Sequence, residues 1–243
     1  MAVRRIMLKQ LLMLMASRVT GDPYFANVKL LLHMDGADAS TTFTDQIGHT
    51  FTARGNAQID TSDSQFGGAS ALFDGTGDWI DTPDSADFTI GSGDMTAEFC
   101  LKANTSTITR YLCGQADASL TGTSISFYMY LTGTGFPGVT VYTGSTAKTV
   151  QGAGSIENDG LWHRLAAVIS SGTLYLYLDG VSIGTPIAIG GAVNDSSEIF
   201  SIGAAGAYGT GRCIGWIDEF RLTIGTARYT GNYTPPTAAF PDS

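Results

Sequence analysis

The sequence predicts an all-β protein built as a two-sheet antiparallel sandwich, and three observations support this. Glycine is abundant, with 31 residues in a chain of 243, whereas there are only four glutamates, a balance that favours strands and turns over helices. Short runs of alternating apolar and polar residues recur along the chain. Gly, Asp and Asn residues separate these runs at the spacing of roughly 8–12 residues that is typical of sandwiches and barrels.

Fifteen short strands are expected, each bounded by turn residues. The Asp74-Gly75 and Asp179-Gly180 pairs mark tight turns, and Ser170-Ser171-Gly172 marks a hairpin. The tail from Tyr233 is rich in proline and is expected to be extended along the surface. In chain order the predicted strands are 28–34, 41–45, 49–54, 57–60, 69–74, 78–82, 95–102, 124–131, 139–142, 147–150, 161–169, 173–178, 181–183, 199–202 and 215–222.

The last predicted strand, Gly215–Leu222, is the most informative segment because it carries an acid among large apolar residues. Strict alternation places Trp216, Asp218, Phe220 and Leu222 on one face. An acid on an apolar face is costly unless backbone N–H groups, a basic side chain or a metal ion pairs with it. The same alternation places Glu219 on the opposite face from Asp218.

Residues 1–27 are predicted to be an N-terminal arm, helical or extended, and residues 28–243 a single domain. The first 18 residues carry +4 with no acid, so the net charge of −9 leaves −13 on the remainder. Lys9 and Gln10 interrupt the apolar run, which is shorter than the roughly 20 residues of a membrane span. We expect residues 1–20 to dock on a partner or on copies of the chain. A secretory leader or a membrane-surface helix are the alternatives.

The acidic body argues against nucleic-acid binding. Cys100, Cys113 and Cys213 match no zinc pattern. Free buried thiols are expected, and a Cys100–Cys113 or Cys113–Cys213 disulfide is the alternative.

Four segments stand in an order that resembles a known family. They are residues 30–36, 68–75, 159–163 together with 177–180, and 215–221. They resemble the laminin-G-like branch of the concanavalin A-like lectin/glucanase jelly roll. The Ile-Asp-Glu-Phe-Arg strand and the Ala-Arg-Tyr tail with its Pro-Pro pair are similar to modules of bacteriophage virion proteins. The resemblance covers about residues 28–240 and implies a jelly roll, a fold that hosts lectins, hydrolases and structural modules.

The resemblance also implies one structural calcium ion where the first and last strands meet. Asp218 would supply a side-chain ligand, with Asp35 and the Asp74-Gly75 turn as weaker candidates. Calcium takes about six to eight oxygen ligands, so water would complete the shell. The alternative is that Asp218 accepts backbone N–H bonds or pairs with an arginine.

Tyrosines are the predicted glycan-binding residues, since sugar rings stack on exposed aromatic side chains. Tyr128, Tyr130 and Tyr142 could share one sheet face with Tyr175 and Tyr177. The alternative is that the rings only cover the sheets. Trp162 and Trp216 are expected in the core.

No catalytic residue is predicted. Hydrolases that resemble the laminarinase group need a Glu-x-Asp-x-(x)-Glu strand, and this chain has none. The three histidines, His33, His49 and His163, have no Ser or Cys partner in a recognisable motif.

The function expected from these features is a non-enzymatic structural or adhesion component of a phage virion. It would be a capsid decoration or tail-associated protein on the outer surface, assembled in the host cytoplasm and bound to other virion proteins or to copies of itself. Cell-surface or environmental glycans are further expected partners. The alternatives are a secreted bacterial carbohydrate-binding protein and a polysaccharide-degrading tail enzyme.

Overall fold

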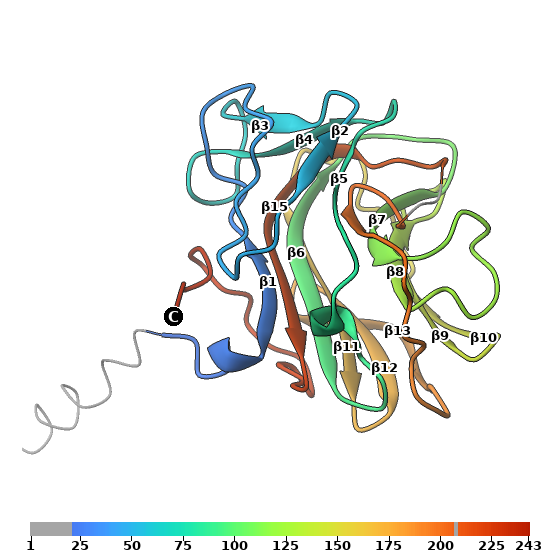
Figure 1. Cartoon of the computed structure of the whole chain (residues 1–243). Helices are drawn as coiled ribbons and strands as arrows, with labels where there is room; N and C mark the ends of the chain where they lie inside the picture. The colour runs from blue at the N-terminus through green and yellow to red at the C-terminus, as the bar shows by residue number, and fades with distance from the viewer. Residues whose placement is uncertain (1–20, 207–208) are drawn as a thin grey trace, which may run out of the picture.

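The computed structural model describes residues 21–206 and 209–243, and this part of the chain forms fifteen strands in two antiparallel sheets (Figure 1). The predicted all-β sandwich is therefore confirmed. Helix is confined, in the described ranges, to two three-residue 3-10 turns, η1 (Phe25–Asn27) and η2 (Ala86–Phe88). Those ranges contain no helix with the length and hydropathy that a membrane crossing requires.

The larger sheet has eight strands, with β6 (Met95–Ala103) and β15 (Ile214–Ile224) at its centre. Two strands, β4 (Ser70–Asp74) and β1 (Val28–Leu32), share one edge of β15. Strand β4 pairs with its first half and β1 with its second. The spatial order is β13 (Val181–Ala188), β12 (Thr173–Leu178), β11 (His163–Ser170), β6 (Met95–Ala103), β15 (Ile214–Ile224), β4 (Ser70–Asp74) and β3 (Gln58–Asp60), with β1 (Val28–Leu32) beside β15.

The smaller sheet has seven strands and faces the first across the core. Its spatial order is β10 (Thr146–Gln151), β9 (Pro137–Thr143), β8 (Phe127–Leu131), β7 (Arg110–Gln115), β14 (Phe200–Ile202), β5 (Trp79–Thr82) and β2 (Thr52–Arg54).

A run of aromatic rings crosses from one sheet to the other. Phe220 of β15 packs on Phe99 of β6, with ring centroids 5.8 Å apart, and on Phe200 of β14 at 5.9 Å. Phe200 also meets Phe127 of β8 at 6.0 Å. All four rings are almost fully buried, and each contributes about 1.5–3 kcal/mol of hydrophobic stabilisation.

A β-bulge in β15 changes which residues face this core. Asp218 pairs with Cys100 and Arg221 pairs with Glu98, so three steps along β15 match two along β6. Glu219 is the extra residue, and its φ of 52° lies in the left-handed region.

The bulge overturns two predictions made from strict alternation. Ile217, Phe220 and Leu222 all belong to the core cluster, so Asp218 does not share a face with Phe220 and Leu222. Nor do Asp218 and Glu219 point to opposite faces. Both bond to segments that cover the outer face of the eight-stranded sheet, as described below.

One predicted strand, residues 41–45, is not a strand. Only an isolated bridge between Thr44 and Thr50 forms there. The Asp45 carboxylate accepts hydrogen bonds from the N–H groups of Leu31 at 2.8 Å and His49 at 2.9 Å. These bonds hold the segment as a turn against β1.

Residues 225–243, here called the tail, cross the outer face of the eight-stranded sheet without forming a strand or a helix. Phe240 is buried, and its ring lies 3.6 Å from the guanidinium carbon of Arg221. Tyr229 and Tyr233 stack with centroids 3.5 Å apart, and both meet a tyrosine of β12 edge-on. The tail is therefore extended as predicted, but it serves as a cover for the sheet.

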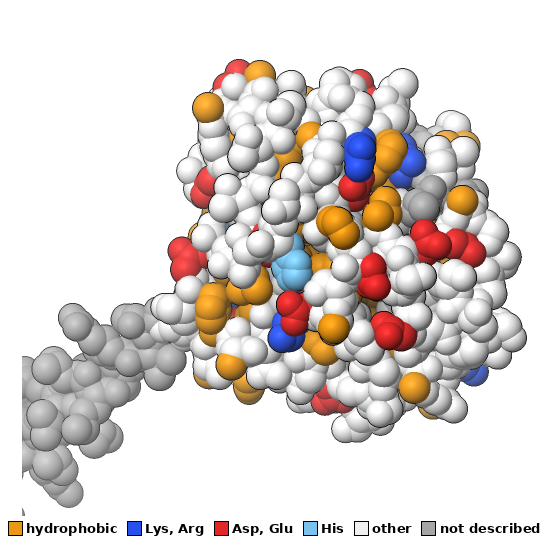
Figure 2. Space-filling model, viewed as in Figure 1, with side chains coloured by type: hydrophobic (Ala, Val, Ile, Leu, Met, Phe, Trp, Pro, Cys, Tyr) orange, Lys and Arg blue, Asp and Glu red, His pale blue; other side chains and the backbone are white. Residues whose placement is uncertain are grey.

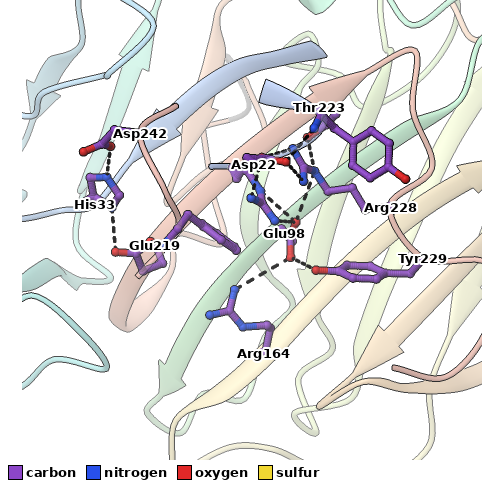
Figure 3. Close-up of polar contacts among 12 residues, drawn as sticks. Asp22, His33, Glu98, Arg164, Glu219, Thr223, Arg228, Tyr229 and Asp242 are labelled. Carbon is purple, nitrogen blue, oxygen red and sulfur yellow. Dashed lines mark hydrogen bonds and ion pairs between the residues drawn. The ribbon is translucent and has the colours of Figure 1, made fainter. Parts of the chain in front are cut away.

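Buried ion pairs hold the tail on the sheet (Figure 3). The Glu98 carboxylate accepts hydrogen bonds from Arg221 Nη2 at 2.7 Å and from the Tyr229 hydroxyl at 2.8 Å. Asp22 accepts from Arg228 Nη2 at 2.6 Å and from Arg221 Nη1 at 3.1 Å. Burial by itself would raise the pKa of Asp22, but the hydrogen bond from Arg228 helps to bring that pKa below its usual value.

The described part of the predicted arm packs on the domain. The Asp22 N–H donates to the backbone oxygen of Ser243 at 2.6 Å, so the two ends of the described chain meet at one edge (Figure 1). Phe25 packs against the buried Val28 and Phe240. Residues 1–20, on which the predicted docking role falls, lie outside the described residues.

The substitution Glu98→Ala should lower the free energy of unfolding by about 3 kcal/mol, because it leaves Arg221 buried with one partner fewer. Urea unfolding measures this loss. Glu198→Ala is the matched control, since the Glu198 side chain makes no described ion pair, and it should change stability by less than about 0.5 kcal/mol. Equal effects of the two substitutions would contradict a stabilising role for the Glu98 network.

Candidate functional site

The tyrosines predicted to bind glycan gather on the outer face of the seven-stranded sheet. Tyr128 and Tyr130 alternate with core residues along β8, and Tyr142 lies on the neighbouring strand β9. The ring centroid of Tyr128 is 6.0 Å from that of Tyr130 and 6.5 Å from that of Tyr142. The structure thus brings the three predicted residues together.

A fourth tyrosine, Tyr111 of β7, joins this group and was missed from the sequence. It is the register partner of Tyr130, and its ring meets Tyr128 edge-on at 5.4 Å. A register shift between Tyr111 and Cys113 breaks the alternation of β7, which hid the strand. We call Tyr111, Tyr128, Tyr130 and Tyr142 the tyrosine surface.

The Tyr130 ring lies over a glycine of the next strand. A Cβ atom at Gly138 would overlap this ring, so the missing side chain leaves room for the ring to lie down on the sheet. The Tyr130 hydroxyl donates to Gln151 Oε1 at 3.1 Å. The half-buried ring is thereby held in one orientation and keeps a part of its surface open to a ligand.

Tyr142 supports the surface rather than exposing a ring. It is 8% exposed, and its hydroxyl donates to the backbone oxygen of Leu120 at 3.0 Å. Tyr111, Tyr128 and Tyr130 are half-buried. Burial raises the pKa of Tyr128 and of Tyr130 above the usual tyrosine value, so both rings stay neutral at ordinary pH.

The outer positions of β8 to β10, which surround most of the tyrosine surface, carry no charged side chain. Thr140 and Thr149 join β9 to β10 through their hydroxyls at 2.9 Å. By alternation and register, the outer positions of β8 to β10 are Tyr128, Tyr130, Gly138, Thr140, Tyr142, Ala147, Thr149 and Gln151. The paired Arg54 and Asp81 lie on β2 and β5 of the same sheet, and Figure 2 shows acidic side chains at several separate places on the face it draws.

Tyr175 and Tyr177 do not share this face, contrary to the prediction. Both lie on β12 of the eight-stranded sheet, where Tyr177 is buried beneath the tail tyrosines. The alternating Leu and Tyr residues of β12 were read correctly as a strand, but alternation cannot say to which sheet a strand belongs.

Asp218, the first predicted calcium ligand, is fully buried beneath the loop of residues 61–68. Its Oδ2 atom accepts from the N–H groups of Gln65 at 2.9 Å and Phe66 at 3.0 Å, whereas Oδ1 has no hydrogen-bond partner. Burial raises the pKa of Asp218 to about 7. The same loop is fixed by Asp63, which accepts from the indole of Trp162 at 2.9 Å.

The two tryptophans expected in the core lie outside it. Trp162 and Trp216 are half-buried, and the Trp216 indole donates to Asp60 at 2.8 Å. Each indole N–H therefore meets an acid on the outer face, as a partly buried tryptophan requires.

Asp35 and Asp74 do not converge with Asp218. The exposed Asp35 carboxylate lies against Gly67, on the loop that covers Asp218. Asp74 pairs with Ile214, four residues before Asp218 on β15, and accepts from Thr76 N–H and Asn56 Nδ2. Among the described residues, no three His, Cys, Asp or Glu side chains form a group that could hold a metal ion.

Two histidines each bridge two carboxylates. His163 contacts Asp179 at 2.7 Å and Asp159 at 2.8 Å, and the hydrogen bond with Asp179 is the main cause that raises its pKa to about 9. His33 similarly contacts Glu219 at 2.8 Å and Asp242 at 2.7 Å. These contacts tie loops and the tail to the sheet, which is a structural role.

All three cysteines are free and buried, as expected. Burial raises the pKa of the Cys100 thiol to about 12, so this thiol is neutral and a poor nucleophile.

The profile of one protein family matches residues 74–224, and the family is described as the concanavalin A-like lectin/glucanases superfamily. The chain belongs to this superfamily. The resemblance inferred from the sequence is thus confirmed at the level of the family and fold. Lectin-type jelly rolls of this kind are typically non-catalytic. No match was found among the curated proteins.

Solved structures agree on the fold. The binding domain of Paraclostridial Mosquitocidal Protein 1 is 13% identical, with a TM-score of 0.65, over 85% of this chain and 50% of that chain. Botulinum neurotoxin type C, whose cell entry depends on two ganglioside molecules, is 11% identical, with a TM-score of 0.61, over 84% and 49%. The chain thus spans about half the length of these toxin chains.

A third structure matches along nearly its whole length. Domain 4 of AbnA, an extracellular arabinanase from Geobacillus stearothermophilus, in complex with arabinotriose, is 18% identical, with a TM-score of 0.58, over 83% of this chain and 94% of that chain. Identities this low establish the shared fold only.

Proposed function

We propose that this jelly roll is a non-enzymatic carbohydrate-binding module, presented on the outer surface of a phage virion as a capsid decoration or tail-associated adhesion protein. The main support for carbohydrate binding is the tyrosine surface. Three of its rings are half-buried and lie at or beside the uncharged outer positions of β8 to β10, which suits the stacking of a neutral sugar ring. Thr149 and Gln151 at its margin offer hydroxyl and amide groups for sugar hydroxyls.

The structural neighbours support a binding role by analogy of fold. The arabinanase domain was solved with arabinotriose, and the type C neurotoxin is described through its ganglioside interaction. A shared fold raises the expectation of a glycan ligand, and the named tyrosines make that expectation specific to this chain.

The geometry of the carboxylates supports a non-enzymatic role. Asp218 and Glu219 are both fully buried, and Glu219 bonds to His33 and to the N–H of Phe240 at 2.8 Å. A glycosidase needs two carboxylates that flank an open cleft. A cleft on the outer face of the eight-stranded sheet has one carboxylate in its lining, that of Asp179.

The virion part of the proposal rests on the resemblance of the Ile-Asp-Glu-Phe-Arg strand and the Ala-Arg-Tyr and Pro-Pro tail to phage virion modules. It also rests on the basic residues 1–20, which would dock the module on other virion proteins or on copies of itself. Free cysteines suit assembly in the host cytoplasm. A structural calcium ion also remains a proposal. The Oδ1 atom of Asp218, buried without a partner, supports it, whereas the scattered positions of Asp35 and Asp74 do not.

Replacing Tyr130 by alanine should weaken binding of a neutral oligosaccharide about tenfold, or about 1.4 kcal/mol, because the stacking platform is lost. A glycan array with the wild-type protein selects the ligand, and calorimetry compares the variants. Tyr175→Ala, on the other sheet, is the control and should bind like wild type. Absence of glycan binding by the wild-type protein, or equal losses in both variants, would refute the proposed site.

If calcium binds at Asp218, chelator should lower the melting temperature of the wild-type protein but not that of Asp218→Ala. The substitution itself should lower the melting temperature by about 5 °C, since two buried N–H groups lose their acceptor. Asp74→Ala should keep the chelator response. An equal chelator response in wild type and Asp218→Ala, or none in either, rules out a metal at Asp218.

Mass spectrometry of the N-terminus of the protein made in bacteria distinguishes the proposed arm from a leader. An intact N-terminus is expected for an assembly arm. Loss of about the first 17 residues, at the small residues that follow the apolar run, would favour the secreted alternative.

A further inference from the structure

A small cleft opens on the outer face of the eight-stranded sheet, on the opposite sheet from the tyrosine surface. It has a volume of about 80 Å³. The sheet, the loop of residues 61–68 and the tail all contribute to it. The lining residues are Gln65, Cys100, Trp162, His163, Arg164, Asp179, Pro235 and Pro236.

Arg164, in the lining of this cleft, is a buried cation without a hydrogen-bonded anion. The residue is 4% exposed, and neither Nη1 nor Nη2 has a hydrogen-bond partner. Among the described residues, Glu98 supplies the only carboxylate in ion-pair contact, at 3.9 Å from Nη1, which is too far for a hydrogen bond (Figure 3). The guanidinium also lies 4.7 Å from the ring centroid of Phe240. A buried charge left in this state is costly.

The network around Arg164 explains why it lacks an anion. Arg164, Arg221 and Arg228 lie around the carboxylates of Glu98 and Asp22, and Arg221 and Arg228 hold both. Arg221 takes Glu98 Oε1 with its Nε and Nη2 atoms, and Tyr229 takes Oε2. Asp22 is held by Arg228 and Arg221. Arg164 is therefore left without a hydrogen-bonded carboxylate in this network.

The other polar groups of the cleft do not pair with the Arg164 Nη atoms. Both oxygens of Asp179 are engaged, Oδ1 by the N–H of Arg164 at 2.8 Å and Oδ2 by His163 at 2.7 Å. Cys100 is the register partner of Arg164 and carries a neutral thiol. The hydroxyl of Tyr233, in the adjoining tail, is a further buried donor without a partner. Three unsatisfied donor atoms thus belong to two neighbouring side chains.

We propose that this cleft binds a carboxylate, with Arg164 as the principal donor. The carboxylate enters between Gln65 and the Pro235-Pro236 pair and takes charge-assisted hydrogen bonds from the Arg164 guanidinium. The two Nη atoms have almost no exposed surface, so the groups that cover them shift when the carboxylate binds. Its source is either an acidic sugar, such as a uronic acid, or a small free acid. The site is independent of the tyrosine surface, which has no charged residue among the outer positions of β8 to β10.

The test measures binding of glucuronate, acetate and neutral glucose to the full chain at fixed ionic strength. Calorimetry gives the affinities, and the indole N–H signal of Trp162 in NMR spectra reports occupancy of the cleft. Saturable binding of glucuronate, with a shift of that signal and no response to glucose, is expected. Acetate binding of similar strength identifies carboxylate alone as the ligand, whereas a preference for glucuronate identifies an acidic sugar.

Two variants test whether carboxylate binding takes place in this cleft. Arg164→Gln should weaken carboxylate binding at least tenfold. Arg212→Gln is the matched control, because Arg212 is also buried with unsatisfied nitrogens but stacks on Trp79, outside the cleft lining. If Arg164→Gln does not fold, Gln65→Trp provides a second test. Gln65 has an exposed side chain at the mouth of the cleft, and its hydrogen bond to Asp218 comes from the backbone N–H. The larger tryptophan side chain should therefore block entry to the cleft.

Three results would overturn the proposal. They are the absence of saturable carboxylate binding by the wild-type protein, equal responses to glucose and glucuronate, and unchanged binding by Gln65→Trp or by a folded Arg164→Gln. Loss of glycan binding at the tyrosine surface would leave this site unaffected.

Discussion

The buried pair of Glu98 and Arg221 is the interaction on which the outer half of this sandwich depends. The two residues are register partners on the central strands β6 and β15. Burying both charges is expensive unless each is fully hydrogen-bonded. The remaining partners come from distant parts of the chain, Tyr229 in the tail and Asp22 before the first strand. The buried charges at the centre of the sheet are therefore stable only when the tail and Asp22 cover them.

The layers of this fold were predictable from the sequence because alternation and turn residues are local. Most strands, including β8 and β12, lie where those patterns place them. The β-bulge at Glu219 was not predictable, since the sequence Asp218-Glu219 is the same whether or not Glu219 is an extra residue in the strand. Its consequence is global: without the extra residue, Phe220 could not reach Phe200 in the other sheet while Asp218 meets the loop.

The candidate sites were predictable only in part, for a related reason. Period two correctly placed Tyr128 and Tyr130 on one face, but the orientation of Tyr130 depends on Gly138 in the next strand. The isolation of Arg164 depends on how two other arginines divide their acids, which involves the tail and residue 22. Such pairings join residues far apart in sequence, and no local pattern records them.

The meeting of Asp22 with Ser243 has a mechanical consequence. A force that separates the two ends of the described chain would act first on that backbone bond and on the adjoining contacts of Asp22 with Arg221 and Arg228. The strands β7 to β10, which carry the tyrosine surface, lie outside this line of tension. Tension applied at these two positions would therefore strain the Asp22 contacts while the opposite sheet kept its shape.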